Sequence, residues 1–156
     1  MSRSTLMSTV VLALVASGAS ASADVSQAVI SSFRGQLVVT KDDLPEGKND
    51  KDTIAKIKAA QLHELTGEQA SDTTQWHFHY TAFLSKNGAS SLKMDFMNDK
   101  GQLSANKQLE GVDAKSYVLS GDITIDEDEG LTKGKTYSVE VLSGNTVLSK
   151  STVSFK

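Results

Sequence analysis

The chain has 156 residues, with 16 lysines and arginines, 19 aspartates and glutamates, and no cysteine. This slight acidic excess argues against a nucleic-acid partner, because phosphate binding requires a concentrated basic surface. Without cysteine there are no disulfides, so the fold must be held by its core alone.

The first 23 residues have the three parts of a secretory signal peptide. Arg3 supplies a positive charge, residues 6–16 are apolar, and residues 21–23 are the small residues Ala-Ser-Ala. The apolar run is well short of the roughly 20 residues that span a bilayer, so we expect no transmembrane segment. The A-x-A ending is of bacterial type and predicts a periplasmic or secreted protein, with residues 24–156 forming one domain.

The mature chain begins with a predicted strand followed by a predicted amphipathic helix. The strand is FRGQLVVT, residues 33–40, and a polar stretch follows it. The helix covers about 52–65, where Asp52 can cap the first free amides and Gly67 can end the helix. At about 100° per residue, one arc of roughly 140° contains Ile54, Ile57, Leu62 and Leu65. This apolar side is expected to pack on the protein's own sheet.

From Gln75 onward the sequence predicts short strands separated by turns. The predicted strands are 76–84, 91–97, 101–109, 116–125, 135–142 and 146–155. With the strand at 33–40 there are about seven, at the spacing that is typical of a β-sandwich.

One corner of this region carries a resemblance to a known fold. GLTKGKTYSVEV, residues 130–141, has a leucine, a turn and a strand led by an aromatic residue. It resembles the corner before the sixth strand of fibronectin type III and other immunoglobulin-like domains, and the resemblance covers about residues 75–156. It implies a mostly β, antiparallel immunoglobulin-like β-sandwich of about seven strands, and it implies no activity. The helix inserted after the first strand departs from the pattern and leaves the strand order open.

The resemblance also implies roles for two residues of the corner. The Tyr137 hydroxyl is expected to bond to backbone a few residues upstream, and Leu131 is its expected packing partner. Trp76 lies on the second predicted strand, which is not the place of the core tryptophan of antibody domains. We still expect Trp76 to be a core residue.

The run WHFHYTAF, residues 76–83, places two histidines two apart. Alternation puts Trp76 on one face of the strand, and His77 and His79 on the other, polar face. A hairpin between 76–84 and 91–97 would place Asp95 opposite His79 and Met97 opposite His77.

These four residues would then form an exposed patch suited to copper or zinc. In an immunoglobulin-like sandwich, however, the two strands usually belong to opposite sheets and the four side chains need not meet. We favour an ordinary polar strand face and keep the metal site as an alternative.

The segment DEDEG, residues 126–130, offers a second candidate site. Asp126 and Asp128 could ligate calcium, but Gly130 and Tyr137 stand where an EF-hand loop needs its fifth and twelfth residues. We favour a solvated loop at a strand end.

No catalytic motif is found in the chain. We therefore expect a non-enzymatic, exported binding or structural module without a resident cofactor, whose partner is another exported protein or a cell-surface component. A fimbrial or adhesin subunit is one form of it, since FRGQLVV and the final strand are similar to strand-exchanging subunits. The alternatives are a periplasmic copper or zinc carrier that uses His77 and His79, and a small hydrolase with an unrecognised site.

Overall fold

The computed structural model describes residues 25–156, so the predicted signal peptide lies outside the described residues. The elements, in chain order, are α1 (Gln27–Phe33), β1 (Leu37–Thr40), α2 (Asp50–Ala60), β2 (Glu64–Leu65), β3 (Glu68–Ala70), β4 (Thr73–Phe83), β5 (Lys93–Met97), β6 (Leu103–Gln108), β7 (Val118–Asp126), the 3₁₀ turn η1 (Glu127–Glu129), β8 (Lys135–Ser143) and β9 (Thr146–Phe155). Neither helix is long and apolar enough to cross a membrane, as far as residues 25–156 show.

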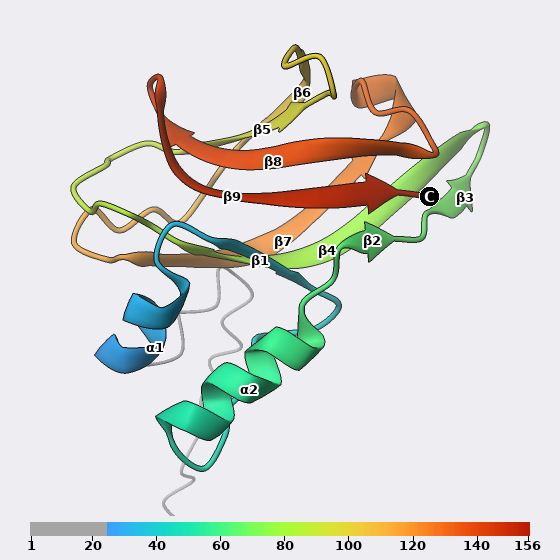
Figure 1. The fold of residues 1–156 in the computed structure, drawn as a ribbon. Coiled ribbons are helices and arrows are strands. Elements are labelled where there is room, and N and C mark those ends of the chain that lie inside the picture. Colours follow the sequence, from blue (N-terminus) through green and yellow to red (C-terminus); the bar gives the residue numbers. More distant parts are fainter. Residues whose placement is uncertain (1–24) are drawn as a thin grey trace, which may run out of the picture.

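The strands form two sheets that pack face to face (Figure 1). In the first, here called sheet 1, β4 pairs antiparallel with β7 on one side and with β1 and β3 on the other. In sheet 2 the order is β2-β9-β8-β5-β6. All neighbours in sheet 2 are antiparallel except β2 and β9, which pair in parallel over two residues.

The strand order defines the fold class. Seven strands have four or more residues, namely β1, β4, β5, β6, β7, β8 and β9. The first, second and fifth of these lie in sheet 1, and the third, sixth and seventh lie in sheet 2, as in immunoglobulin-like domains. The fourth, β6, lies at the edge of sheet 2 beside β5. The chain is an immunoglobulin-like antiparallel β-sandwich, and the predicted fold class is confirmed.

Phe155, the last residue of β9, is the centre of the core between the sheets. Four aromatic rings surround it edge-on, with centroid distances of 5.5 Å for Trp76, 6.4 Å for Phe78, 5.9 Å for Phe96 and 5.6 Å for Tyr137. Edge-to-face geometry is favourable because the positive ring edge meets the negative ring face. Trp76 is fully buried, and its indole N–H donates to the Lys156 carbonyl at 3.1 Å.

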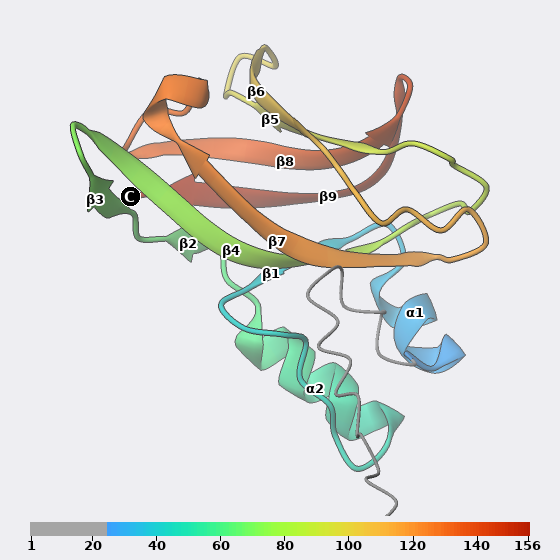
Figure 2. The ribbon, with the colours of Figure 1, turned by 180° about the vertical axis from the view of Figure 1, so that it is seen from behind.

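A second apolar cluster lies between the outer face of sheet 1 and the two helices. Figures 1 and 2 both show the helices on this face, below sheet 1. The buried members of the cluster are Val29, Phe33, Val38, Ile57, Phe83 and Val118. The rings of Phe33 and Phe83 lie 5.2 Å apart. One end of sheet 1 is therefore covered on both faces.

The first predicted strand, residues 33–40, is only half correct. Residues Gln27–Phe33 form α1, with Ser26 as its N-cap, and the strand begins at Leu37. The apolar residues of this stretch serve two structures, because Phe33 packs under the helices while the residues of β1 join sheet 1.

The predicted helix at about 52–65 is shifted and too long. Asn49 caps α2 instead of Asp52, and α2 ends at Ala60. The next residues turn to strand contacts, since the Leu62 N–H donates to the Val39 carbonyl at 2.7 Å and Leu65 pairs with β9. The side chains of Leu62 and Leu65 join the core between the sheets, whereas Ile54 and Ile57 pack in the cluster under the helices. The predicted apolar arc is therefore divided between two cores.

Gly67 does not end the helix but makes room for β4. A Cβ atom on Gly67 would lie 2.8 Å from the Trp76 indole nitrogen, so a larger residue would displace this ring. Gly121 of β7 has a similar place, because a Cβ there would lie 3.1 Å from the ring of Tyr80 on the paired strand. Burial, and then the nearby Asp122 carboxylate, raise the pKa of Tyr80 to about 12.

This pKa predicts a loss of stability in alkali. An unfolded tyrosine releases its proton near pH 10, so between pH 10 and pH 12 the unfolded chain loses a proton that folded Tyr80 retains. The free energy of unfolding should therefore fall over this window, by on the order of 2 kcal/mol from this group. Urea denaturation at pH 9 to 11.5 should show a shallower decline for Tyr80→Phe, and parallel declines would contradict the prediction.

Candidate functional site

The corner before β8 contains the bond that the resemblance implies. The Thr132 N–H donates to the Tyr137 hydroxyl oxygen at 2.8 Å, five residues upstream. Tyr137 and Leu131 are both buried in the core between the sheets. The corner thus joins the crossover segment to the core, which is a structural role.

Removal of this hydroxyl should weaken the fold without changing it. Tyr137→Phe deletes one buried hydrogen bond and leaves the Thr132 N–H without it, so unfolding should become easier by about 0.5 to 2 kcal/mol. Chemical denaturation measures the change. An unchanged midpoint would mean that this bond does not hold the corner.

The two histidines of β4 contact side chains of β7 on the outer face of sheet 1. His77 is exposed, and its Nδ1 lies 2.6 Å from the Thr124 hydroxyl. His79 is buried, and its Nδ1 lies 3.0 Å from Asp122 Oδ1 and 3.7 Å from Asp43 Oδ1. Each histidine contacts the residue directly opposite it on β7, so the two rings hold the Thr124 and Asp122 side chains over sheet 1.

The structure does not bring together the four residues of the alternative metal site, His77, His79, Asp95 and Met97. β4 and β5 do not form a hairpin: β4 lies in sheet 1, and β5 lies in sheet 2 between β6 and β8. Asp95 pairs with Glu140 and Asn106, and Met97 pairs with Ser138 of β8 and, after a register shift, with Leu103 of β6. The core lies between these residues and the histidines.

The histidines lie on a polar strand face, as favoured from the sequence, but His79 is only 3% exposed instead of solvated. Within residues 25–156 no group of three or more His, Asp or Glu is placed to hold a metal ion.

The acidic segment at the end of β7 is bonded within the chain. Asp126 caps η1, since its carboxylate accepts from the Glu129 N–H, and the Glu129 carboxylate accepts from the Asp126 N–H, both at 3.1 Å. Glu127 accepts from the Thr74 N–H at 2.9 Å, and Glu129 also pairs with Lys107. Asp126 and Asp128 belong to no group of three metal-ligating side chains in the described part of the chain.

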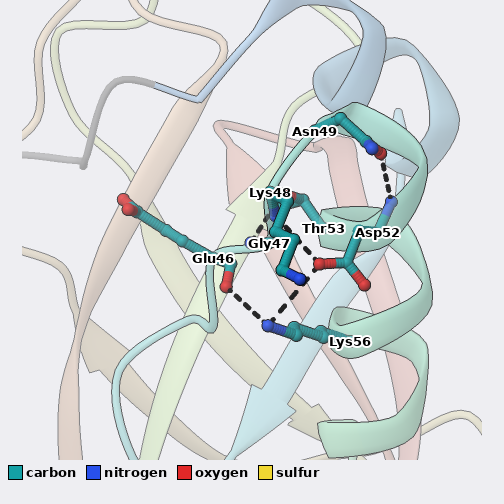
Figure 3. Close-up of polar contacts among 7 residues, drawn as sticks. All are labelled: Glu46, Gly47, Lys48, Asn49, Asp52, Thr53 and Lys56. Carbon is teal, nitrogen blue, oxygen red and sulfur yellow. Dashed lines mark hydrogen bonds and ion pairs between the residues drawn. The ribbon is translucent and has the colours of Figure 1, made fainter.

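A pocket of about 530 Å³ lies between α1, the loop 44–49 and the start of α2. Figure 3 shows how this loop is tied to α2. The Gly47 N–H donates to the Thr53 hydroxyl and the Lys48 N–H to the Asp52 carboxylate, both at 2.9 Å, while Lys56 donates to the Glu46 carbonyl at 3.2 Å. The pocket rim is therefore held rigidly, but its mixed apolar and polar lining identifies no ligand.

One lateral side of the sandwich is closed by the chain itself. The outer edge of β9 and the residue after it donate three bonds: the Lys150 N–H to the Gly35 carbonyl at 3.2 Å, the Ser154 N–H to the His63 carbonyl at 2.9 Å, and the Lys156 N–H to the Leu65 carbonyl at 2.8 Å. On β1, the Leu62 N–H occupies the Val39 carbonyl. These contacts cover strand edges that would otherwise invite pairing with another chain.

The opposite side carries β7 of sheet 1 and β6 of sheet 2, both seen in Figure 2. The Leu84 N–H donates to the Tyr117 carbonyl at 2.8 Å, in the register that continues along β4 and β7. Bonded and non-bonded pairs alternate in antiparallel strands, so the odd-numbered residues of β7 point their N–H and C=O groups at β4. The even-numbered residues of β7 point their N–H and C=O groups away from β4, at the open edge of sheet 1.

Both ends of this outer edge of β7 are capped. The Ser116 hydroxyl accepts from the Val118 N–H at 3.0 Å and donates to the Val118 carbonyl at 2.8 Å, and Glu129 takes the Asp126 N–H. Between them lies the edge window, residues 120–124. Within the part of the chain that the structure describes, the outward N–H and C=O groups of Ser120, Asp122 and Thr124 have no protein partner.

Because His79 is buried and His77 is exposed, the two histidines should contribute differently to the free energy of unfolding. His79→Ala removes a buried ring and its contact with Asp122, so it should lower the free energy of unfolding by about 1 to 3 kcal/mol. His77→Ala changes an exposed residue and should cost no more than about 0.5 kcal/mol. Urea denaturation of both variants tests the contrast, and equal costs would refute it.

Comparisons with known proteins add a likeness in fold only. No family model matches the chain, and no curated protein matches it. A solved structure described as an immunoglobulin-like protein from Pseudomonas aeruginosa is 12% identical, covers 78% of this chain and 90% of its own, and superposes with a TM-score of 0.39. The assignment of the fold rests on the strand order described above.

Proposed function

We propose that the chain is an exported, non-enzymatic binding module that meets another exported protein or a cell-surface component through the side of the sandwich formed by β7 and β6. The observation that carries this proposal is the contrast between the two lateral sides. The chain bonds the edges of β9 and β1 to its own backbone, and it leaves the edge window of β7 without such bonds within residues 25–156.

Two features of the sequence support the rest of the proposal. Residues 1–23 have the composition of a bacterial signal peptide, which supports export to the periplasm or the medium. The chain has no cysteine nucleophile and none of the common catalytic motifs, which favours binding over catalysis.

The strand-exchanging form of a fimbrial subunit receives no support. β9 pairs with β8 along its whole length, and the other edge of β9 is covered by β2 and by residues 35–36. The chain thus supplies the last strand of its own sandwich. A partner strand would be added at the open side instead of inserted into the core.

Site-specific crosslinking in the producing cells tests the proposal. A photoreactive residue is placed on the open side in Thr124→p-benzoylphenylalanine and on the closed side in Lys150→p-benzoylphenylalanine, both at exposed strand positions. We expect a discrete adduct from position 124 and little or none from position 150. Mass spectrometry of the exported chain should show an N-terminus at Asp24.

Two outcomes would contradict the proposal. Equal adduct yields from the two positions would mean that the open side has no special part in binding. Retention of the protein in the cytoplasm with residues 1–23 attached would remove the exported context.

A further inference from the structure

We infer that the edge window, residues 120–124, binds an extended segment of the partner that carries a lysine or arginine opposite Asp122. This inference rests on the proposed function and names the chemistry of the partner. The mode is strand addition, in which main-chain bonds to a sheet edge supply affinity and side chains supply specificity.

The edge of β7 lacks most of the usual devices that prevent strand addition, and the one charged residue in the window is Asp122. Such devices are short strands, bulges, prolines and lysines on the edge. β7 has nine residues in a continuous register with β4, and its sequence VLSGDITID contains no proline, lysine or arginine. β6, the other strand on this side, has a register shift opposite Phe96 and Met97, and it carries Lys107. β7 is therefore the strand of this side that is open to pairing.

The charge around the window is negative. Asp122 lies at the centre of the window with a side chain that is 84% exposed. The Asp43 side chain is 88% exposed, and both carboxylates lie near His79 Nδ1. An added strand would place a side chain directly opposite Asp122 on the outer face. Opposite charges in such cross-strand pairs are favourable, so this position selects a cationic residue.

The histidines of β4 prepare this surface. His79 Nδ1 lies 3.0 Å from the Asp122 carboxylate, and His77 Nδ1 lies 2.6 Å from the Thr124 hydroxyl. Both contacts hold side chains of the window over sheet 1, away from the strand edge. The backbone groups of the window remain accessible while its charge is kept in place.

A second copy of the chain is a poor occupant. Two antiparallel windows in full register would pair Ser120 with Thr124 and Asp122 with its own copy. Like charges directly opposite each other are destabilising in a sheet. Self-pairing is thus disfavoured at the position where a basic partner gains most.

Short synthetic peptides test the inference on the chain of residues 24–156. The probe is acetyl-Thr-Val-Lys-Val-Thr-amide, with Glu in place of Lys in a matched acidic probe. Titration followed by ¹⁵N NMR should shift the amides of Ser120, Asp122 and Thr124 more than those of Leu119, Gly121 and Ile123. The acidic probe should bind roughly three- to tenfold more weakly.

Two controls separate backbone pairing from charge. Methylation of the lysine backbone nitrogen in the probe removes one pairing N–H without touching the protein, so binding should be lost or greatly weakened. Asp122→Lys should reverse the preference between the two probes, and its denaturation midpoint checks that the variant is folded.

Equal affinity for both probes, shifts that map outside the edge window, or binding that survives methylation would overturn the inference. A dimer that forms through β7 in concentrated protein would also overturn it, in favour of a second copy. None of these results would abolish a crosslink from position 124 in cells, so the proposed function would be judged separately.

Discussion

Within residues 25–156, β4 is the one strand on which all other strands of sheet 1 depend, because β1, β3 and β7 each pair with it. Its alternation controls both faces of that sheet. Trp76, Phe78 and Tyr80 enter the core, while His77 and His79 face outward. The backbone hydrogen bonds of β4 alternate as well: successive residues bond to β1 on one side and to β7 on the other. The open edge of β7 is a direct result of this arrangement.

The two faces of sheet 1 differ in what they bury. The inner face meets sheet 2 around Phe155, and the outer face meets α1 and α2 through a separate apolar cluster. At the end away from that cluster the outer face becomes polar, with His79, Asp122 and Asp43 in contact. The outer face of sheet 1 is thus covered by the helices at one end and exposes polar side chains at the other.

Much of this fold could be predicted from alternation and turn residues. The six strands expected after Gln75 are all present, and their ends differ from the expected ones by a few residues at most. Sequence patterns failed to predict short segments whose structure is decided by tertiary contacts. Residues 61–65 continue a helical apolar pattern, yet they cover the edges of β1 and β9. The burial of His79 depends on neighbours from distant parts of the sequence, so no local pattern indicates it.

The candidate site was less predictable because an edge is a property of the strand order. Consecutive strands with compatible side chains allowed a hairpin of β4 with β5, while the immunoglobulin-like resemblance implied that they lie in opposite sheets, and the second arrangement is the one observed. Asp122 and Thr124 were part of a correctly predicted strand, but nothing local distinguishes an edge strand from a central one. The caps that Ser116 and Glu129 place at the two ends of that edge are known only from the structure.

The position of Phe155 at the centre of the core has a consequence for how the chain folds. The contact between Trp76 and the carbonyl of Lys156 joins residues 80 apart in sequence, and the four rings around Phe155 come from strands throughout the chain. Such distant contacts make folding slow, because the loops must close before the contacts form. A growing chain cannot complete this core before β9 emerges, so the aromatic residues of the earlier strands stay exposed until that strand has been synthesised.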